Sequence, residues 1–179
     1  MALKSTVFKA ELTISDMDRN YFQEHSLTIA RHPSENDERM MVRILAFALH
    51  AHEHLSFTKG IGSTSAEEPD IWQKDLTGDV DVWIEVGQPD EKRIKKACKR
   101  AKEVFIYTYS GRGADVWWEQ MKGKVGRFQN LKVRSLTHAQ CKLLSELAER
   151  TMQLQFTVQD RQIWVSSESN TVQIELGVK

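Results

Sequence analysis

The chain of 179 residues carries 25 basic and 25 acidic residues, so its formal net charge is zero at neutral pH. This balance lacks the strong basic excess of dedicated nucleic-acid-binding proteins, and a hydrophobic content of 40% excludes a disordered chain. The length suits one packed core, and we expect residues 1–179 to form a single domain.

The cysteines and the first residues indicate the cellular compartment. Cys98 and Cys141 lie far apart, without CxxC or zinc-finger spacing, which argues against disulfides and structural zinc. The N-terminal MALKSTVFKAEL carries no apolar signal segment, and no run of about 18 apolar residues occurs. We expect a soluble cytoplasmic protein with no membrane partner.

The N-terminal third predicts a β-hairpin followed by a helix. STVFKAELTI and HSLTIAR are β-rich runs on either side of the turn-like DMDRN. In the next segment, SENDERMMVRILAFALHAHEHL, Ser34 as N-cap and Asp37 at the N3 position form a capping box, and apolar residues recur at helical spacing. The Gly- and Ser-rich FTKGIGSTSAEE then predicts a loop that leads into PDIWQKDLTGDVDVWIEV.

Helical and extended patterns alternate from Pro89 onward. We expect helices over PDEKRIKKACKRA, ADVWWEQMKG and THAQCKLLSELAER, with VFIYTYS and LKVRS as the strands between them. Three further strands, MQLQFTV, RQIWVSS and TVQIEL, follow. The pattern predicts an α/β (α+β) fold, in which a mixed sheet is flanked by helices and strands near both ends of the sequence add a β-rich layer.

The two runs around Thr77-Gly78 predict a hairpin with a definite register. A turn centred on this dipeptide brings PDIWQKD and DVDVWIEV together as antiparallel neighbours. The facing pairs are Asp70 with Glu85, Ile71 with Ile84, Trp72 with Trp83, Gln73 with Val82, and Lys74 with Asp81. Aromatic pairs and opposite charges stabilise such a register.

The first of these pairs breaks the pattern, because Asp70 and Glu85 place two carboxylates opposite each other, which is destabilising. A positive group between them is therefore expected. A divalent cation such as Mg²⁺, which prefers oxygen ligands, is one answer, and a basic side chain is another. A third interpretation is that this strand face is simply the solvated face of a half-buried sheet.

Long stretches of the chain resemble the YaeQ family of bacterial proteins, over essentially the whole length. The stretches are ARHPSENDERMMVRILAFALHA, LSFTKGI, WIEVGQPDEKRIKKA and VFIYTYS. The resemblance implies the restriction-endonuclease-like core of the PD-(D/E)XK nuclease superfamily, with a metal site on a central hairpin. On that pattern Asp70 and Glu85 are the Mg²⁺ ligands, and Glu38 on the first helix is the supporting acid.

The sequence departs from the superfamily pattern at Gly87, where a lysine is expected two residues after the second acid. That lysine normally positions or activates the attacking water and stabilises negative charge. The candidates to replace it are Gln88, Arg93, Lys95 and Lys96. We favour Lys95, which flanks the buried stripe of its helix, and include Gln88 among the site residues.

The resemblance implies Mg²⁺-dependent hydrolysis of phosphodiesters, with nucleic acid as the partner. A basic run on the helix after Pro89 could then hold phosphates: Lys92, Arg93, Lys95, Lys96, Lys99, Arg100 and Lys102. The same run also reads as a solvated helix face. The alternative function is a non-catalytic module for nucleic acid or for an unknown protein partner, which has lost the nuclease lysine.

Two other patterns each leave two interpretations. The HAHEH run contains His50, His52 and His54, of which His50 and His54 fall on one helix face, and it indicates either a transition-metal site or a solvated helix end. Arg39 and Arg43, four residues apart, either bind phosphate or pair with neighbouring acids.

Overall fold

The computed structural model describes residues 5–58, 68–109 and 111–179. The chain divides into two compact units. The first unit comprises Met1–Leu49 and Ala139–Leu176, and the second comprises His50–His138 and Gly177–Lys179. That all 179 residues form a single domain stays a prediction.

The first unit contains a five-stranded mixed sheet in the order β10-β9-β8-β1-β2. Its strands are β1 (Thr6–Asp16), β2 (Tyr21–Arg31), β8 (Thr151–Gln159), β9 (Gln162–Ser166) and β10 (Thr171–Glu175). The neighbours β1 and β8 are parallel, and the other neighbours are antiparallel. The predicted N-terminal hairpin and the three late strands are therefore confirmed, and they share one sheet.

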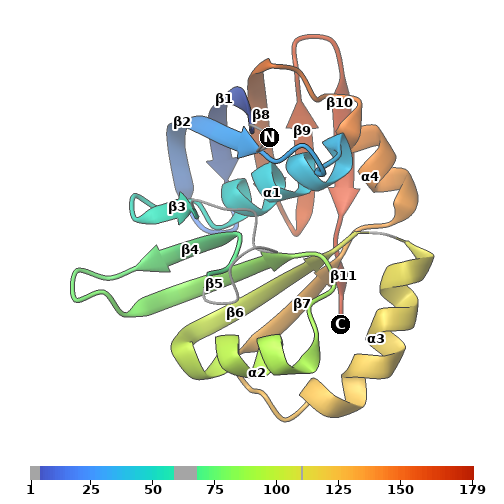
Figure 1. The fold of residues 1–179 in the computed structure, drawn as a ribbon. Coiled ribbons are helices and arrows are strands. Elements are labelled where there is room, and N and C mark those ends of the chain that lie inside the picture. The colour runs from blue at the N-terminus through green and yellow to red at the C-terminus, as the bar shows by residue number, and fades with distance from the viewer. Residues whose placement is uncertain (1–4, 59–67, 110) are drawn as a thin grey trace. The chain divides into compact units, whose positions relative to one another are not determined.

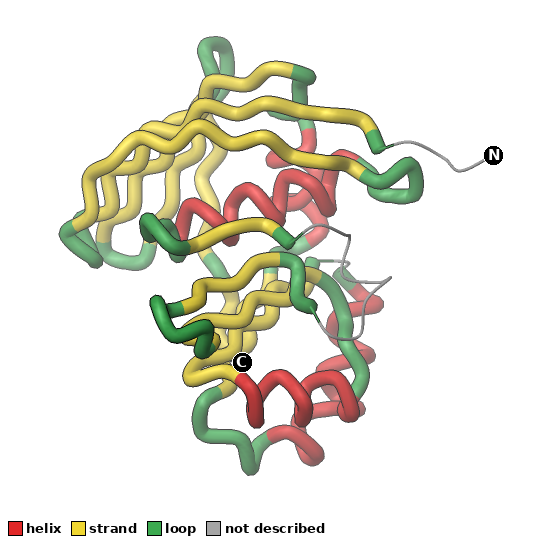
Figure 2. Tube along the Cα trace, turned by 60° about the vertical axis from the view of Figure 1, so that its left-hand side comes forward, coloured by secondary structure: helices red, strands yellow, loops and turns green. Residues whose placement is uncertain are grey.

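Alternation along the strands gives this sheet one buried and one polar face. On β1 the residues Phe8, Leu12 and Ile14 are buried, whereas the intervening Glu11 and Thr13 are exposed. Such alternation is typical of a sheet that packs on one side only. Helix α1 (Asp37–Leu49) lies on one face of the sheet (Figure 2).

Helix α1 begins two residues later than the sequence pattern predicts. Asn36 is its cap, because the Asn36 side-chain oxygen accepts a hydrogen bond from the Arg39 backbone N–H at 2.9 Å. The assignment of Ser34 as N-cap is wrong, since the Ser34 side chain bonds to the His32 ring instead. Asn and Ser are comparable caps, so the sequence offers both starts.

The second unit contains a six-stranded mixed sheet in the order β11-β7-β6-β5-β4-β3. Its strands are β3 (Leu55–Phe57), β4 (Ile71–Lys74), β5 (Val80–Val86), β6 (Ala101–Thr108), β7 (Leu131–Ser135) and β11 (Gly177–Val178). Strands β5, β6 and β7 are parallel neighbours, and the remaining pairings are antiparallel.

Two helices connect the parallel strands of this second sheet. Helix α2 (Glu91–Arg100) joins β5 to β6, and α3 (Arg112–Val125) joins β6 to β7. Both lie on the same side of the sheet (Figure 1), where α2, α3 and the strands share a core. This core contains Ile94, Ile106, Trp117, Met121, Val125 and Val133.

The expected fold class is confirmed, because the protein is α+β with two mixed sheets and flanking helices. The last helix, α4, runs from His138 to Ser145, shorter than its sequence pattern. In the described parts of the chain, every helix is too short or too polar to cross a bilayer.

The β4–β5 hairpin follows the predicted register up to one irregularity. Ile71 faces Ile84, Trp72 faces Trp83 and Gln73 faces Val82, as expected. The last predicted pair is wrong, because a β-bulge makes Lys74 face Val80 instead of Asp81. Asp81 instead forms an ion pair with Lys102 at 2.8 Å.

Candidate functional site

Asp70 extends the β4–β5 hairpin by one residue and is almost fully buried. Its backbone N–H donates to the Ile84 carbonyl at 3.1 Å. Its carboxylate oxygen Oδ2 accepts a hydrogen bond from the Val86 backbone N–H at 2.8 Å. These two bonds hold the carboxyl group beside the C-terminal end of β5, next to the position of Glu85.

Glu85 is buried on β5, on the same face of that strand as Trp83. Its oxygen Oε1 accepts hydrogen bonds from Trp83 Nε1 at 3.0 Å and from Arg93 Nε at 2.7 Å. The Arg93 guanidinium also donates to the Glu68 carbonyl at 2.7 Å. Arg93 therefore supplies a positive charge at the acid pair.

The environment of Glu85 opposes its ionisation. Burial and, second to it, the negative charge of Asp70 raise the pKa of Glu85 to about 7, although Arg93 and the Trp83 hydrogen bond act in the opposite direction. The Asp70 carboxylate accepts its hydrogen bond from the residue directly after Glu85, so the two acids are neighbours at the end of β5. The interpretation as a merely solvated strand face does not fit, because both acids are buried.

The start of α2 positions the arginine. Asp90 caps the helix through a 2.8 Å hydrogen bond from the Arg93 backbone N–H to its carboxylate. The residue before it, Pro89, accepts a 2.8 Å hydrogen bond from Trp117 Nε1 at its carbonyl. The first turn of α2 is therefore tied both to its own cap and to α3.

Gly87 stands two residues after Glu85, where the resemblance leads us to expect a lysine, and its backbone conformation disfavours any side chain. Its φ angle is +127°, which residues with a side chain rarely adopt. A lysine at this position would be strained, although no atom lies within 4 Å of the place that its Cβ would take. The positive charge comes from the following helix instead.

The remaining predicted site residues are Glu38, Gln88 and Lys95. Gln88 is exposed in the connection between β5 and α2, and Lys95 is exposed on α2. Glu38 lies half-buried on α1, in the first unit, whereas Asp70 and Glu85 lie in the second. The roles of Glu38, Gln88 and Lys95 at an acid site stay predictions.

Two carboxylates suit Mg²⁺ chemically, because the ion prefers oxygen ligands and commonly uses one or two protein carboxylates. Asp70 and Glu85 are the residues that would hold it. In the described residues, no three His, Cys, Asp or Glu side chains converge as a metal site. A cation bound at Oε1 of Glu85 would also have to replace the Arg93 hydrogen bond.

His50 and His54 do not lie on one helix face, because α1 ends at Leu49. His50 instead lies against the second sheet, with its Nε2 at 2.6 Å from the Tyr107 hydroxyl and its ring 4.2 Å from that of Phe105. This packing explains the histidine without a metal.

A buried ion cluster joins Glu35, which precedes α1, to Arg39 and Arg43 on the helix. The Glu35 carboxylate, 1% exposed, pairs with Arg43 at 2.9 Å and with Arg39 at 3.2 Å. The ion-pair interpretation is confirmed. Glu35 was not predicted as the shared acid, although it precedes the two arginines at spacings of four and eight residues.

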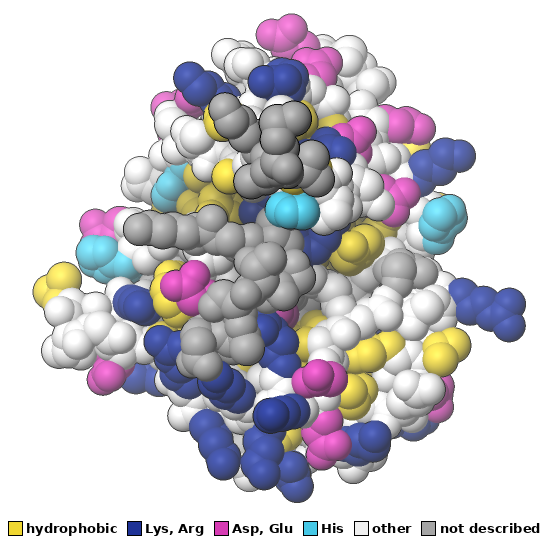
Figure 3. Space-filling model, in the orientation of Figure 1, with side chains coloured by type: hydrophobic (Ala, Val, Ile, Leu, Met, Phe, Trp, Pro, Cys, Tyr) yellow, Lys and Arg dark blue, Asp and Glu magenta, His cyan; other side chains and the backbone are white. Residues whose placement is uncertain are grey.

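Lysines form a stripe on the exposed side of α2. Lys92, Lys95 and Lys99 are all exposed, and their spacing of three and four residues places them on one side of the helix. Basic side chains gather over α2 in the space-filling view (Figure 3). Within the described chain these three make no ion pair, unlike Arg93 and Lys102.

An aromatic side chain lies beside the end of this helix. Trp72 on β4 is half-buried, and its ring is 3.8 Å from Lys74 Nζ and 5.5 Å from the Arg100 guanidinium. Both distances suit cation–π contacts. The basic surface of α2 thus continues onto the β4–β5 hairpin.

Comparisons with known proteins agree on one family. A family model described as YaeQ protein matches residues 1–176. The uncharacterized YaeQ proteins of Salmonella typhi and Escherichia coli (strain K12) are each 47% identical over 176 residues, which covers 98% of this chain and 96% of theirs.

Two solved structures of YaeQ proteins are similar throughout. The crystal structure from Xanthomonas axonopodis pv. citri has a TM-score of 0.93 at 44% identity and covers 98% of both chains. The one from Pseudomonas syringae has a TM-score of 0.91 at 30% identity and covers 97% of this chain and 95% of that one.

Proposed function

Starting from the fact that the chain belongs to the YaeQ family, we propose that its second unit is a non-catalytic module that binds the phosphate backbone of nucleic acids in the cytoplasm. The observation that carries this proposal is the exposed lysine stripe Lys92, Lys95 and Lys99. The stripe extends about 10 Å along the helix, which suits contacts with successive phosphates.

The state of the acid pair favours binding over cleavage. Hydrolysis needs carboxylates that are available to a metal and a lysine that acts on the attacking water. Here Arg93 is hydrogen-bonded to Glu85, and Gly87 stands in place of the lysine. On this proposal, the protein has a scaffold related to the PD-(D/E)XK nucleases and uses the pair to fix α2 over the sheet.

The test is the salt dependence of nucleic-acid binding. Fluorescence anisotropy of a labelled 20-nucleotide strand, single and in duplex, is measured between about 50 and 200 mM salt. Replacing Lys92, Lys95 and Lys99 together by Gln is expected to weaken binding and to reduce the slope of log K against log salt by about 2 to 3.

The matched control removes three exposed lysines elsewhere. Replacing Lys9, Lys142 and Lys179 by Gln changes the net charge equally but leaves α2 intact. The control variant is expected to keep the slope of the natural protein. Equal losses in both triple variants, or no binding by the natural protein, would contradict the proposal.

Mg²⁺-dependent hydrolysis of phosphodiesters is the second candidate function, favoured by the electrostatic interaction of Asp70 with Glu85. Bound Mg²⁺ would lower the pKa of a coordinated water and polarise the phosphodiester. Asp70 and Glu85 would hold the ion, Lys95 and Gln88 would contact the phosphate, and Glu38 would support the site.

Cleavage assays test this second candidate. Labelled DNA and RNA are incubated with the protein and millimolar Mg²⁺ or Mn²⁺, and products are separated on denaturing gels. The candidate predicts cleavage by the natural protein and its loss in Asp70→Asn. Cleavage that persists in Asp70→Asn indicates a contaminating nuclease and removes support for this site.

A further inference from the structure

The polar face of the first sheet is hollowed into a groove. One cavity of about 440 Å³ lies across strands β1, β2, β8 and β9. A second of about 320 Å³ adjoins it and shares the lining residues Gln153, Leu154, Ser167 and Glu168. Volumes of this size match small-molecule sites. Leu12 and Leu154 also border the cavity, although their side chains are buried, and the other lining side chains are polar.

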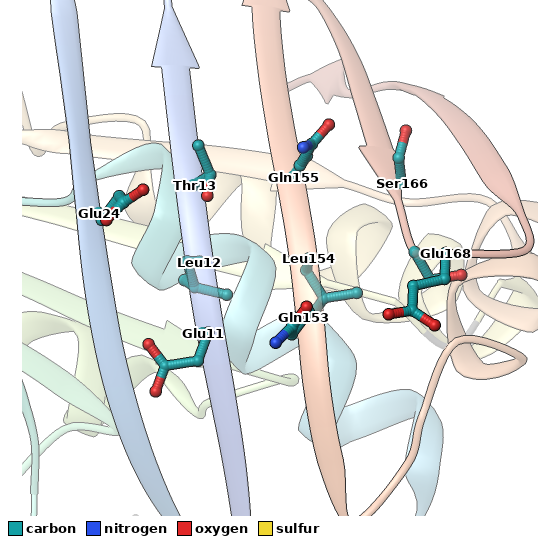
Figure 4. Close-up of a pocket in the computed structure, with 10 residues that line it drawn as sticks. Glu11, Leu12, Thr13, Glu24, Gln153, Leu154, Gln155, Ser166 and Glu168 are labelled. Atoms are coloured by element: carbon teal, nitrogen blue, oxygen red, sulfur yellow. The ribbon is translucent and has the colours of Figure 1, made fainter.

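The polar side chains lie in two rows across the strands (Figure 4). The register places Glu24, Thr13, Gln155 and Ser166 in one row. Glu11, Gln153 and Glu168 lie in the neighbouring row (Figure 4). The groove therefore offers hydroxyl, amide and carboxylate groups on a rigid β-sheet floor.

Hydrogen bonds fix several of these groups in place. The Ser26 hydroxyl donates to Glu11 Oε2 at 2.6 Å. The hydroxyls of Ser166 and Thr171 lie 3.0 Å apart. Side chains held in this way lose little conformational entropy when a ligand binds, so the floor is partly pre-organised.

Two aromatic side chains stand on the same face, one row further along the strands. This row runs Phe22, Ser15, Thr157 and Trp164 across β2, β1, β8 and β9. Phe22 is 52% exposed, and Trp164 is half-buried. Three strand spacings separate them, roughly 14 Å, so the two apolar rings stand at the same end of the polar floor, one on β2 and one on β9.

We propose that this groove binds an uncharged oligosaccharide. Sugar hydroxyls donate and accept hydrogen bonds, which matches a floor that offers both carboxylate acceptors and amide donors. The apolar faces of sugar rings can pack on Phe22 and Trp164. This inference is independent of the proposed nucleic-acid function, which concerns the other unit.

The composition of the groove argues against charged ligands. Among the described residues that line the larger cavity, none is Lys, Arg or His, whereas Glu11, Glu24 and Glu168 are carboxylates. A phosphate-bearing ligand would therefore meet repulsion. An ammonium ligand could bind the carboxylates and the amide oxygens of Gln153 and Gln155 but not their amide N–H groups, because an ammonium group only donates, whereas a sugar hydroxyl can bind all of these groups.

Saturation-transfer NMR and calorimetric titration test the site with defined probes. The probes are the neutral hexasaccharides cellohexaose, maltohexaose and chitohexaose, with spermine as the cationic comparison. At least one hexasaccharide is expected to bind, with an affinity that changes less than twofold between about 50 and 200 mM salt, since no ion pair forms.

Two variants and a control locate the binding. Gln153→Ala with Gln155→Ala, and separately Trp164→Ala, are expected to weaken hexasaccharide binding at least tenfold. Thr28→Ala, an exposed position of the same face outside the groove, is expected to bind as the natural protein does. Thermal midpoints confirm that each variant is folded.

Three outcomes would overturn the proposal. The first is that no hexasaccharide binds at 10 millimolar, which is about the weakest affinity that the titration detects. The second is that spermine alone binds, with an affinity that falls steeply with salt. The third is that a hexasaccharide binds but the folded groove variants keep the natural affinity.

Discussion

Glu85 couples the stability of the protein to pH. Its pKa is about 7 in the folded chain against an ordinary value of 4.5, because it is buried beside Asp70. Between these two values the folded state binds more protons than the unfolded state, so the free energy of unfolding falls as pH rises. The full contribution of Glu85 is present below about pH 4.5 and is lost as pH rises through about 7.

We predict that Glu85→Gln removes this part of the pH dependence. The natural protein is expected to lose up to about 3 kcal/mol of unfolding free energy between pH 5 and 8 relative to the variant. Urea denaturation across that range measures the difference. Glu103→Gln, an exposed acid, is the control and should follow the natural protein.

A specific pH profile would show that this prediction is wrong. If Glu85→Gln and the natural protein show parallel pH profiles, Glu85 is ionised throughout. In that case Arg93 would outweigh burial and the charge of Asp70.

At the residue scale, the sequence predicted that two acids lie side by side, but it did not identify the positive group that contacts them. Hairpin register places Asp70 beside Glu85, because neighbouring pairs are fixed by alternation and a turn. Arg93 and Lys95 flank the same buried stripe of α2, so helical periodicity does not show which of the two reaches the acid pair. Only the packing of α2 against the sheet decides that Arg93 reaches Glu85 at 2.7 Å.

The contact between α2 and strand β5 depends on the first turn of the helix. Asp90 caps the helix, and the same turn carries Arg93 to Glu85. Asp90→Ala is expected to lower the unfolding free energy by about 1 kcal/mol, because an N-cap hydrogen bond is lost. Asp90→Asn retains an acceptor and should cost only a few tenths of a kcal/mol.

Urea denaturation at pH 7 measures both Asp90 variants. An equal loss in Asn and Ala would show that the charge of Asp90, not its capping hydrogen bond, stabilises the helix. No loss in either would show that the Trp117 bond to Pro89 is enough to hold the first turn.

At the element scale, strands and helices were predictable where local signals were strong, and their ends were not. Alternation on β8 and helical spacing on α2 reflect side-chain burial, which the sequence records directly. The start of α1 was missed because Asn36 and Ser34 are both competent caps. The bulge at Lys74 was missed because it depends on how the loop after it closes.

At the scale of the whole molecule, the first unit joins segments from distant parts of the sequence. Strand β1 pairs in parallel with β8, so Lys9 faces Thr151 and Asp16 faces Val158. The sequence predicted β-rich segments at both ends but not their order, because a parallel pair between distant segments leaves no local signal. The polar groove on this sheet was missed for the same reason.

We infer that Arg93, and not a metal ion, balances the acid pair. The most direct test is the thermal midpoint of the natural protein, of Glu85→Gln and of Glu103→Gln, each with and without 5 mM Mg²⁺ or Mn²⁺. A ligand at about 100 times its dissociation constant adds roughly 2.7 kcal/mol of stability, so a bound metal would be visible.

We expect Mg²⁺ or Mn²⁺ to change the thermal midpoint of all three proteins equally, by less than about 1 °C. This change corresponds to a few tenths of a kcal/mol. A rise of several degrees in the natural protein and in Glu103→Gln that disappears in Glu85→Gln would contradict this expectation. That result would identify Asp70 and Glu85 as metal ligands and support the hydrolytic function instead.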